Sequence, residues 1–343
     1  APEKGARDRM HDERFYIGHG PLTVEALFPD CEIRGERARA VVSAGALGYA
    51  GANALAYADE RRGGALESAA GAIVLTAAAA AAAPAGATLV ITPRPRARFA
   101  EALRRLVSLR GFAPDAAMIA PDARIEAGVA LAPGVVIGSG ARIGADTQIG
   151  PNAVIGPGVT IGRRCRIGAC ATLYCALLGD DVTILAGAHI GEAGFAVAAG
   201  PEGLVDVMHI GRVILQDGVS LGAGVTVDRG LFADTVLSEN AKIDNLSQIA
   251  HNVVVGRNVV MAAFAGISGS TRIEDGAQLG GRVGVADHVR IGKAARLAAN
   301  TALFRDVPDG AVYGGFPGQP VRRWLREVTW LSKKASERRD AGE

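Results

Sequence analysis

The chain has 343 residues, of which 49% are hydrophobic and only 5% aromatic, and its formal net charge is +2. This near-neutral charge argues against a nucleic-acid-binding protein, because such proteins gather Lys and Arg on one face. No apolar run approaches the roughly 18 residues of a membrane-spanning helix, so we expect no integral membrane segment. The 46 glycines and the scarcity of aromatic residues favour a repeat protein with an aliphatic core and many tight corners.

The chain is long enough for two domains and a tail. Its first part, residues 1–14, is rich in charge and shows no signal peptide, so we expect a terminus that is disordered or foreign to the native chain. Residues 15–115 mix helical and extended patterns and predict a small α/β domain. The expected helices lie at residues 22–28 and 99–109, and the expected strands at residues 40–42 and 73–75.

A six-residue repeat runs through residues 116–310 and predicts a mainly β fold. Every sixth residue from Ile119 to Leu173 is aliphatic, and from Ile243 to Leu303 every sixth residue is aliphatic or Met. The next position is often Gly, and the fifth position of each hexad is small or β-branched. This period fits neither an α-helix nor an alternating strand. It predicts a prism of short parallel strands joined by corners that glycine eases, with successive coils stacked about 4.8 Å apart.

The repeat is interrupted between its two runs. Residues 174–183 slip out of phase, and residues 192–209 form a glycine-containing loop. A long loop within so regular a stack is usually functional.

The tail, residues 311–343, contains a predicted amphipathic helix after Pro320. Its apolar face comprises Val321, Trp324, Leu325, Val328 and Leu331. Because such a face is too hydrophobic to stand alone in water, we expect three tails to meet around the axis of a homotrimer.

Two of the six histidines, His251 and His288, lie at outward positions near a corner of the predicted prism. They are two coils and one residue apart, so they share an edge and lie about 10 Å from each other. An exposed histidine more often has no chemical role than a catalytic one, so spacing alone assigns none. His189 and His209, at the edges of the loop, are expected to have a surface or packing role.

The four cysteines show no CxxC spacing, which suggests neither a zinc site nor a disulfide framework. Cys165 falls at the small inward position of its hexad and is expected in the core. A chain with unpaired cysteines and no visible signal peptide fits a reducing cytoplasm best.

Distinctive motifs gather in the second half of the chain. They are Thr226-Val227-Asp228-Arg229-Gly230, Ile243-Asp244-Asn245, Gln248-Ile249-Ala250-His251-Asn252 and Gly280-Gly281, with Gly194-Phe195 and Ile210-Gly211-Arg212-Val213 in and after the loop. These motifs, and the order of the predicted domains, resemble the hexapeptide-repeat acyltransferases, most specifically the UDP-3-O-(3-hydroxyacyl)glucosamine N-acyltransferases of lipid A biosynthesis. The resemblance covers about residues 20–335 and implies a left-handed parallel β-helix assembled as a homotrimer.

The resemblance also implies a reaction. A 3-hydroxyacyl chain passes from acyl carrier protein to the 2-amine of a UDP-3-O-acylglucosamine, without a metal or other cofactor. His251 matches the general base of the family. The chemistry needs such a base because the amine loses a proton as it attacks the thioester carbonyl, and an imidazole with a pKa of about 6.5 suits that task.

Other residues take roles by the same resemblance. His288 matches a second active-site histidine with an assisting role. Gly269, one coil beyond His251, offers a backbone N–H for an oxyanion hole, although an ordinary corner glycine would look the same. The expected substrate-binding residues are Tyr49, Asn53, Asn245, Gln248 and Asn252. The family's α/β domain holds uracil with an aromatic residue and an Asn three residues later, whereas here Asn53 follows Tyr49 by four.

The expected protein partner, acyl carrier protein, is acidic, so its docking surface should be basic. Residues 282–305 contain five Lys or Arg residues against a single acid, Asp287. We expect Arg290, Lys293 and Arg296 to dock the carrier protein. A solvated basic face that merely balances acids elsewhere is the alternative interpretation.

Other functions remain open from the sequence. An O-acyltransferase acting on UDP-N-acetylglucosamine shares the repeat and the Ala250-His251 motif, and an acetyl-CoA-dependent sugar acetyltransferase shares the repeat. A metal-dependent carbonic anhydrase of the γ type needs three histidines that converge between subunits, and a non-catalytic repeat scaffold needs none. The α/β domain and the loop at Phe195 favour the N-acyltransferase.

Overall fold

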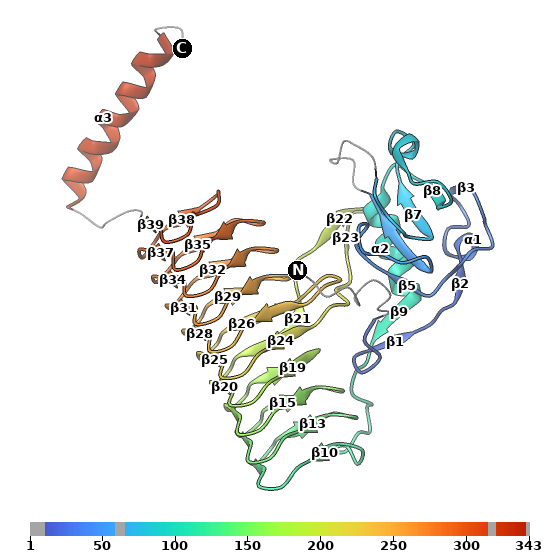
Figure 1. The fold of residues 1–343 in the computed structure, drawn as a ribbon, viewed down its shortest axis with the longest axis horizontal. Helices are drawn as coiled ribbons and strands as arrows, with labels where there is room; N and C mark the ends of the chain where they lie inside the picture. Colours follow the sequence, from blue (N-terminus) through green and yellow to red (C-terminus); the bar gives the residue numbers. More distant parts are fainter. Residues whose placement is uncertain (1–10, 59–65, 315–319, 341–343) are drawn as a thin grey trace.

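The computed structural model describes residues 11–58, 66–314 and 320–340. Figure 1 shows an N-terminal domain beside the middle of a long β-helix, and a helix that projects beyond the last coils. The expected combination of α/β domain, hexapeptide β-helix and C-terminal helix is confirmed. Within the described ranges, none of the helices has the length and apolar character needed to cross a membrane.

The N-terminal domain is built on a five-stranded sheet. Its strands, in spatial order, are β3 (Glu32–Arg34), β8 (Thr88–Ile91), β7 (Ala72–Leu75), β6 (Ala54–Tyr57) and β5 (Ser43–Ala44). β3 runs antiparallel to β8, and the other neighbours are parallel. A short 3-10 helix, η2 (Ala79–Ala82), follows β7. α2 (Pro95–Leu106) packs on this sheet through an apolar face that includes Phe99 and Leu103.

Strand pairing shortens the first expected helix and ends the second one early. Only α1 (Val24–Leu27) is helical within residues 22–28, because β2 (Leu22–Thr23) pairs with β4 (Ala40–Val41). α2 begins before residue 99, and its expected last turn is instead β9 (Val107–Leu109), which pairs with β1 (Tyr16–Gly18). Tertiary pairing thus overrides helical propensity at both ends. The strands expected at residues 40–42 and 73–75 match β4 and β7 to within one residue.

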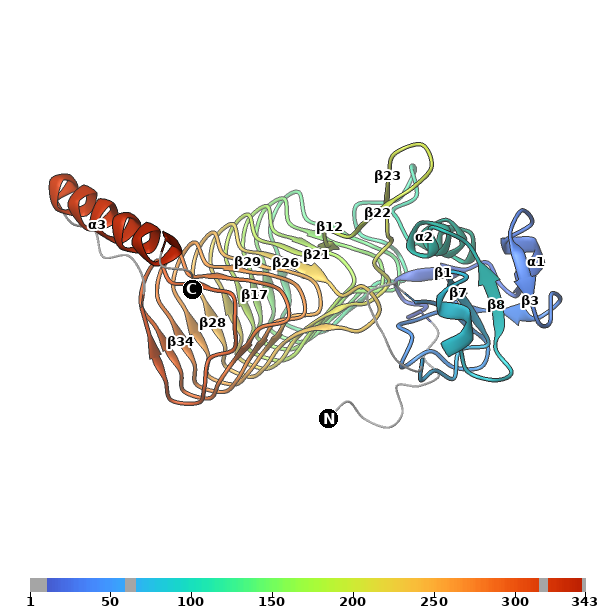
Figure 2. The same cartoon turned by 90° about the horizontal axis from the view of Figure 1, so that it is seen from above.

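The β-helix has three flat faces, each a parallel sheet of short strands (Figure 2). They are a first face of nine strands from β10 (Arg124–Ile125) to β36 (Arg290–Ile291), a second face of ten strands from β11 (Ala130–Leu131) to β39 (Val312–Tyr313), and a third face of nine strands from β12 (Val136–Ile137) to β38 (Ala302–Leu303). We call the turns that follow these faces the first, second and third corners. The third corner leads from the third face to the first face of the next coil.

The hexad determines which side chains point inward. The aliphatic position is buried, as at Ile143, and so is the small position, as at Cys165. The glycine after the aliphatic residue has a different role from the expected one, because it does not supply a positive φ. A Cβ on Gly144 would lie 2.6 Å from the carbonyl carbon of Gly162 in the next coil. Close stacking therefore requires glycine there, and the left-handed bend falls two residues later, at Asp146 with a φ of 61°.

The phase slip is the loss of one residue from a coil. Val154 pairs with Thr172, 18 residues later, whereas Thr172 pairs with His189, 17 residues later. The corner at Cys175 absorbs the change with a positive φ of 45°.

The interrupting loop leaves the third corner between β21 (His189–Ala193) and β24 (Val213–Leu215). Part of it folds as a hairpin of β22 (Val197–Ala199) and β23 (Leu204–Asp206). Small apolar side chains at the base of the hairpin pack against Ala97 and Ala100 of α2. The loop therefore joins the α/β domain to the middle of the β-helix.

Residues 1–10 lie outside the described residues, but residues 11–14 contradict the expected disorder. Arg212 Nη1 donates to Asp12 Oδ2 at 2.8 Å, and Arg212 Nη2 donates to Asp234 Oδ2 at 2.8 Å. The hydroxyl of Tyr16 donates to the Gly211 carbonyl at 2.8 Å. A largely buried guanidinium is stable only with charged partners. Because one partner of Arg212 is Asp12, the start of the chain is held against the β-helix.

α3 (Val321–Asp340) confirms the predicted C-terminal helix. The β-helix extends past the expected boundary at residue 310, because β39 completes the second face. On α3, Val321, Leu325, Val328 and Leu331 expose between 45% and 65% of their surface, and the side chain of Trp324 lies outside the described set. Within the described part of the chain, this apolar face is uncovered.

Candidate active site

The third corner brings residues from successive coils into one row. The strands that end there include β29 (Gln248–Ile249), β32 (Gly266–Ile267) and β35 (Gly284–Val285). The N–H of Ser270 donates to the His251 carbonyl at 3.0 Å, and the N–H of His288 donates to the Gly269 carbonyl at 3.0 Å. His251, Gly269 and His288 therefore lie on one edge in three consecutive coils, as the spacing predicted.

Asn252 fixes the orientation and tautomer of His251. Its Oδ1 lies 3.1 Å from Nδ1 of His251 and accepts the N–H of Leu231 at 3.0 Å. Its Nδ2 donates to the Ala233 carbonyl at 3.0 Å, which settles which end of the amide faces the ring. An amide oxygen only accepts hydrogen bonds, so Nδ1 of His251 carries the proton and Nε2 keeps a lone pair. His251 is thus set up to accept a proton at Nε2.

Two glycines make room for the His251 ring. A Cβ on Gly269 would lie 2.7 Å from Cε1 and 2.9 Å from Nε2 of His251. A Cβ on Gly194, in the loop, would lie 2.9 Å from the Cβ of His251. In the described part of the chain, the N–H of Gly269 has no hydrogen-bond acceptor. This corner therefore places a free N–H donor beside the His251 imidazole.

Charged groups of β26 (Thr226–Arg229) border the same corner. Nε2 of Gln248 donates to Oδ2 of Asp228 at 2.9 Å. Burial raises the pKa of Asp228, while the bond from Gln248 and the nearby His251 oppose that rise. Arg229 is only 5% exposed. Its guanidinium donates to the carbonyls of His209 at 3.0 Å and Gly191 at 2.8 Å, so it holds both ends of the inserted loop.

His209, expected to have a surface or packing role, lies beside the predicted base. Its ring centroid is 5.2 Å from that of His251, with an angle of 59° between the rings. Only 1% of its surface is exposed. Burial, followed by the charges of His251 and Arg229, lowers the pKa of His209 to about 4, so the ring is neutral at physiological pH. No spacing in the sequence indicates this contact, because the inserted loop brings His209 to the corner.

The predicted substrate-binding residues do not all meet at this corner. Gln248 and Asn252 lie at or next to it, as described above. Asn245 is at the second corner, one face away from His251, where its Oδ1 accepts the N–H of Ala223 at 2.7 Å. Tyr49, 64% exposed, and Asn53, also exposed, lie in the α/β domain between β5 and β6.

The three residues expected to dock the carrier protein do not share a surface. Arg290 is on the first face, where it pairs with Glu274 at 3.3 Å and Asp309 at 2.9 Å. Lys293 is at the first corner, and Arg296 lies on the second face in β37 (Arg296–Leu297). Steps of three residues lead around a corner of the prism, and only whole coils stay on one edge. The sequence prediction of one docking surface beside His251 is therefore wrong for this trio.

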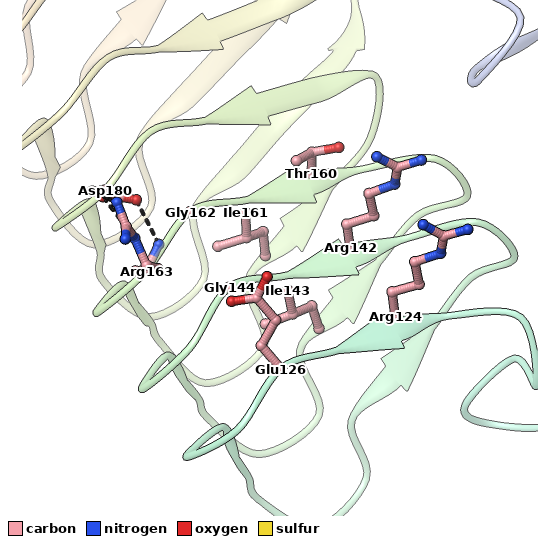
Figure 3. A pocket seen from close by; sticks show the side chains of 10 residues that line it. All are labelled: Arg124, Glu126, Arg142, Ile143, Gly144, Thr160, Ile161, Gly162, Arg163 and Asp180. Atoms are coloured by element: carbon pink, nitrogen blue, oxygen red, sulfur yellow. Dashed lines mark hydrogen bonds and ion pairs between the residues drawn. The ribbon is translucent and has the colours of Figure 1, made fainter.

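A cavity of about 420 Å³ lies on the first face, several coils before His251. Figure 3 shows Arg124 and Arg142 extending side by side from adjacent strands, with Thr160 on the next strand. Arg163 on its rim is paired with Asp180 at 2.8 Å. This cavity is separate from the third corner. In the ranges described, no group of three or more His, Cys, Asp or Glu side chains is arranged to hold a metal ion.

The comparisons with known proteins agree with the six-residue repeat. A family described as bacterial transferase hexapeptide (six repeats) matches residues 140–175 and 234–269, and a hexapeptide repeat of succinyl-transferase matches residues 270–305. A solved UDP-N-acetylglucosamine O-acyltransferase from Moraxella catarrhalis is 23% identical, with a TM-score of 0.39, over 59% of this chain and 72% of its own. The repeat matches and the three-faced β-helix together define a hexapeptide-repeat β-helix protein.

Relatives at higher identity narrow this class. A UDP-3-O-acylglucosamine N-acyltransferase from Caulobacter sp. (strain K31) is 49% identical over 96% of this chain and 98% of its own length. One of the same description from Methylobacterium sp. (strain 4-46) is 46% identical over 88% of each chain. The chain belongs to the UDP-3-O-acylglucosamine N-acyltransferase family.

Proposed function

We propose that this chain moves a 3-hydroxyacyl group from acyl carrier protein to the 2-amine of UDP-3-O-(3-hydroxyacyl)glucosamine, a step of lipid A biosynthesis, with His251 as the general base. The observation that carries the proposal is the fixed Nε2 lone pair of His251 beside the free N–H of Gly269. The chemistry needs both a proton acceptor and a donor for a developing oxyanion.

The proposed steps use these groups in turn. The amine nitrogen attacks the thioester carbonyl carbon, and its proton passes to Nε2 of His251. The carbonyl oxygen gains a negative charge, which the N–H of Gly269 stabilises in the tetrahedral intermediate. When the intermediate collapses, the C–S bond breaks and His251 returns the proton to the thiolate of the carrier protein. No cofactor takes part, and His288, one coil beyond Gly269, assists by contacting the substrate.

We further propose that the enzyme is a homotrimer in which a neighbour covers the first face. Outward residues of consecutive first-face strands form an apolar row: Leu177, Ile214, Val236 and Val254. The uncovered apolar side of α3 also calls for partners. The first face begins at the third corner, so a neighbour there would border His251 and could bring its own α/β domain, with Tyr49 and Asn53, to the nucleotide.

The acidic carrier protein would approach the third corner from the C-terminal end, where Arg305 follows β38 on the same edge as His251. We place the reaction in the cytoplasm, because the four cysteines are unpaired, as is usual in a reducing compartment. The sister reaction, O-acylation of UDP-N-acetylglucosamine, is the second candidate, since the repeat is common to both.

The test is an acyl-transfer assay that pairs each UDP-sugar with a 3-hydroxyacyl carrier protein. We expect product only with the 3-O-acylated amine as acceptor; O-acylation of UDP-N-acetylglucosamine would support the sister activity instead. His251→Ala should keep the fold, because the side chain lies at an edge, and should lower turnover by about 10²–10⁴. A correctly assembled variant with near-normal turnover would refute the role of His251.

A further inference from the structure

We infer that His209 is a positioning residue for His251: its buried, uncharged ring holds the His251 imidazole in place and supplies a lone pair to the imidazolium formed when His251 accepts the substrate proton. The inference rests on the proposed function, in which His251 is the base. His209 itself contacts no substrate in this proposal.

The two rings share the small space that Gly194 leaves open. A Cβ on Gly194 would lie 2.9 Å from Nε2 of His209, 2.9 Å from the Cβ of His251 and 3.0 Å from its Cδ2. Nε2 of His209 and the Cβ–Cδ2 edge of His251 therefore both line the space beside Gly194, whereas Gly269 faces the Cε1–Nε2 edge of the His251 ring; the two ring centroids are 5.2 Å apart. Between these contacts the His251 ring has little freedom to rotate, which is what a general base needs for repeated, accurate proton transfer.

The lone pair of His209 has no other use in the described part of the chain. A hydrogen bond with the backbone of Val207 favours a proton on the His209 ring. Nε2 of this ring is buried and has no hydrogen-bond partner among the described residues. The proton of the neutral ring therefore sits on Nδ1, and Nε2 is an acceptor. Buried polar atoms are rarely left unpaired. The lone pair on Nε2 of His209 interacts favourably with His251 once a positive charge forms on the His251 ring.

The surrounding charges keep His209 in its neutral form. Arg229 donates to the His209 carbonyl, and the positive charge of Arg96 on α2 also lowers the pKa of the His209 ring. With His251, these cations disfavour a second positive charge at a buried site. The charge of Asp228 also interacts with His251. Only His251 can then take up a proton during turnover, and the neutral His209 does not oppose that charge.

The test compares His209→Phe with His209→Gln in the full-length protein. Phe keeps a ring of similar size without a lone pair, whereas the amide of Gln can accept a hydrogen bond. For His209→Phe we expect a kcat lower by about tenfold, because the imidazolium loses one favourable electrostatic contact, comparable in size to a hydrogen bond, with KM values little changed. The acid limb of the pH profile should move to lower pH, because the imidazolium loses its stabilising acceptor. His209→Gln should restore both quantities most of the way.

His19→Phe is the matched control, because His19 is an exposed histidine of the α/β domain that contacts Ser108 and lies away from the third corner. It should leave kcat and the pH profile unchanged. If His209→Phe does not fold, Gly194→Ala tests the same contact, since its methyl would enter the shared space and should lower kcat in the same way.

An NMR titration of the His251 ring gives a readout that does not depend on turnover. The pKa of His251 should be lower in His209→Phe than in the native protein and in His209→Gln. An unchanged titration and kcat in His209→Phe, or a His209→Gln variant as impaired as His209→Phe, would overturn the inference. If His251→Ala is inactive and His209→Phe behaves like the native protein, only the inference about His209 is refuted. If His251→Ala is active, the proposed function itself is refuted.

Discussion

Replacing Gly269 with Ala should displace the proposed base without removing any hydrogen-bond donor. The added Cβ would lie 2.7 Å from Cε1, 2.9 Å from Nε2 and 3.2 Å from Nδ1 of His251. Carbon atoms in contact prefer a separation of about 3.5–4.0 Å, so the ring must move by about 1 Å. A displacement of that size at a reacting group costs about 10²-fold in rate. The backbone N–H remains, so the oxyanion donor is retained.

The second corner of the next coil offers a matched control. Gly281 occupies the equivalent position of its hexad, and a Cβ there would meet only the Ala263 carbonyl, at 3.5 Å. We expect Gly281→Ala to be nearly silent. Gly269→Ala should lower kcat about 10²-fold and cost no more than about 1–3 kcal/mol of stability. Steady-state kinetics and thermal melts of both variants measure this. Equal turnover in the two would show that the base does not need its observed position.

Three other outcomes follow from the contacts. Asn252→Ala removes the acceptor at Nδ1 of His251 and two hydrogen bonds to the backbone, so kcat should fall about tenfold and Tm should drop. An unchanged kcat would show that His251 acts without help from the Asn252 side chain. Burial favours a higher pKa for Asp12, but hydrogen bonds from Arg14 and Arg212 lower it from 3.8 to about 2. Its stabilising effect should be complete above pH 3.8 and be lost as the pH falls through 2, so urea midpoints of the native protein and Asp12→Asn should converge there. Light scattering should find a trimer, and a stable, active monomer would contradict the assembly.

The sequence predicted the features that depend on period. Because the hexad alone decides which residue faces inward, the burial of Ile143 and Cys165 followed directly from the sequence, and so did the row of His251, Gly269 and His288 on one edge. The same rule explains the error over Arg290, Lys293 and Arg296, because residues three apart cannot stay on one edge of a prism with six-residue sides.

Features that depend on the loop or on contacts between domains could not be predicted in this way. His209 lies 42 residues before His251, and the hairpin that intervenes has no period from which its return could be counted. The ordering of residues 11–14 depends on the buried Arg212, whose carboxylate partners are Asp12 near the N-terminus and Asp234, 22 residues after Arg212. The glycine after each aliphatic residue was predicted, but for the wrong reason, because the constraint comes from the next coil.

The attachment of the α/β domain to the middle coils bears on how the molecule unfolds. In a stack where each coil touches only its neighbours, opening normally begins at an end and spreads inward. Here the coils that carry Gly211, Arg212 and the β22–β23 hairpin are also held from the side, by Tyr16, Asp12 and α2. The coils before these attached coils and the coils after them can therefore fray independently, as two short stacks. Amide protons near β24 and β26 should therefore exchange last, and the coil of His251, close to the attached coils, is shielded from fraying at either end.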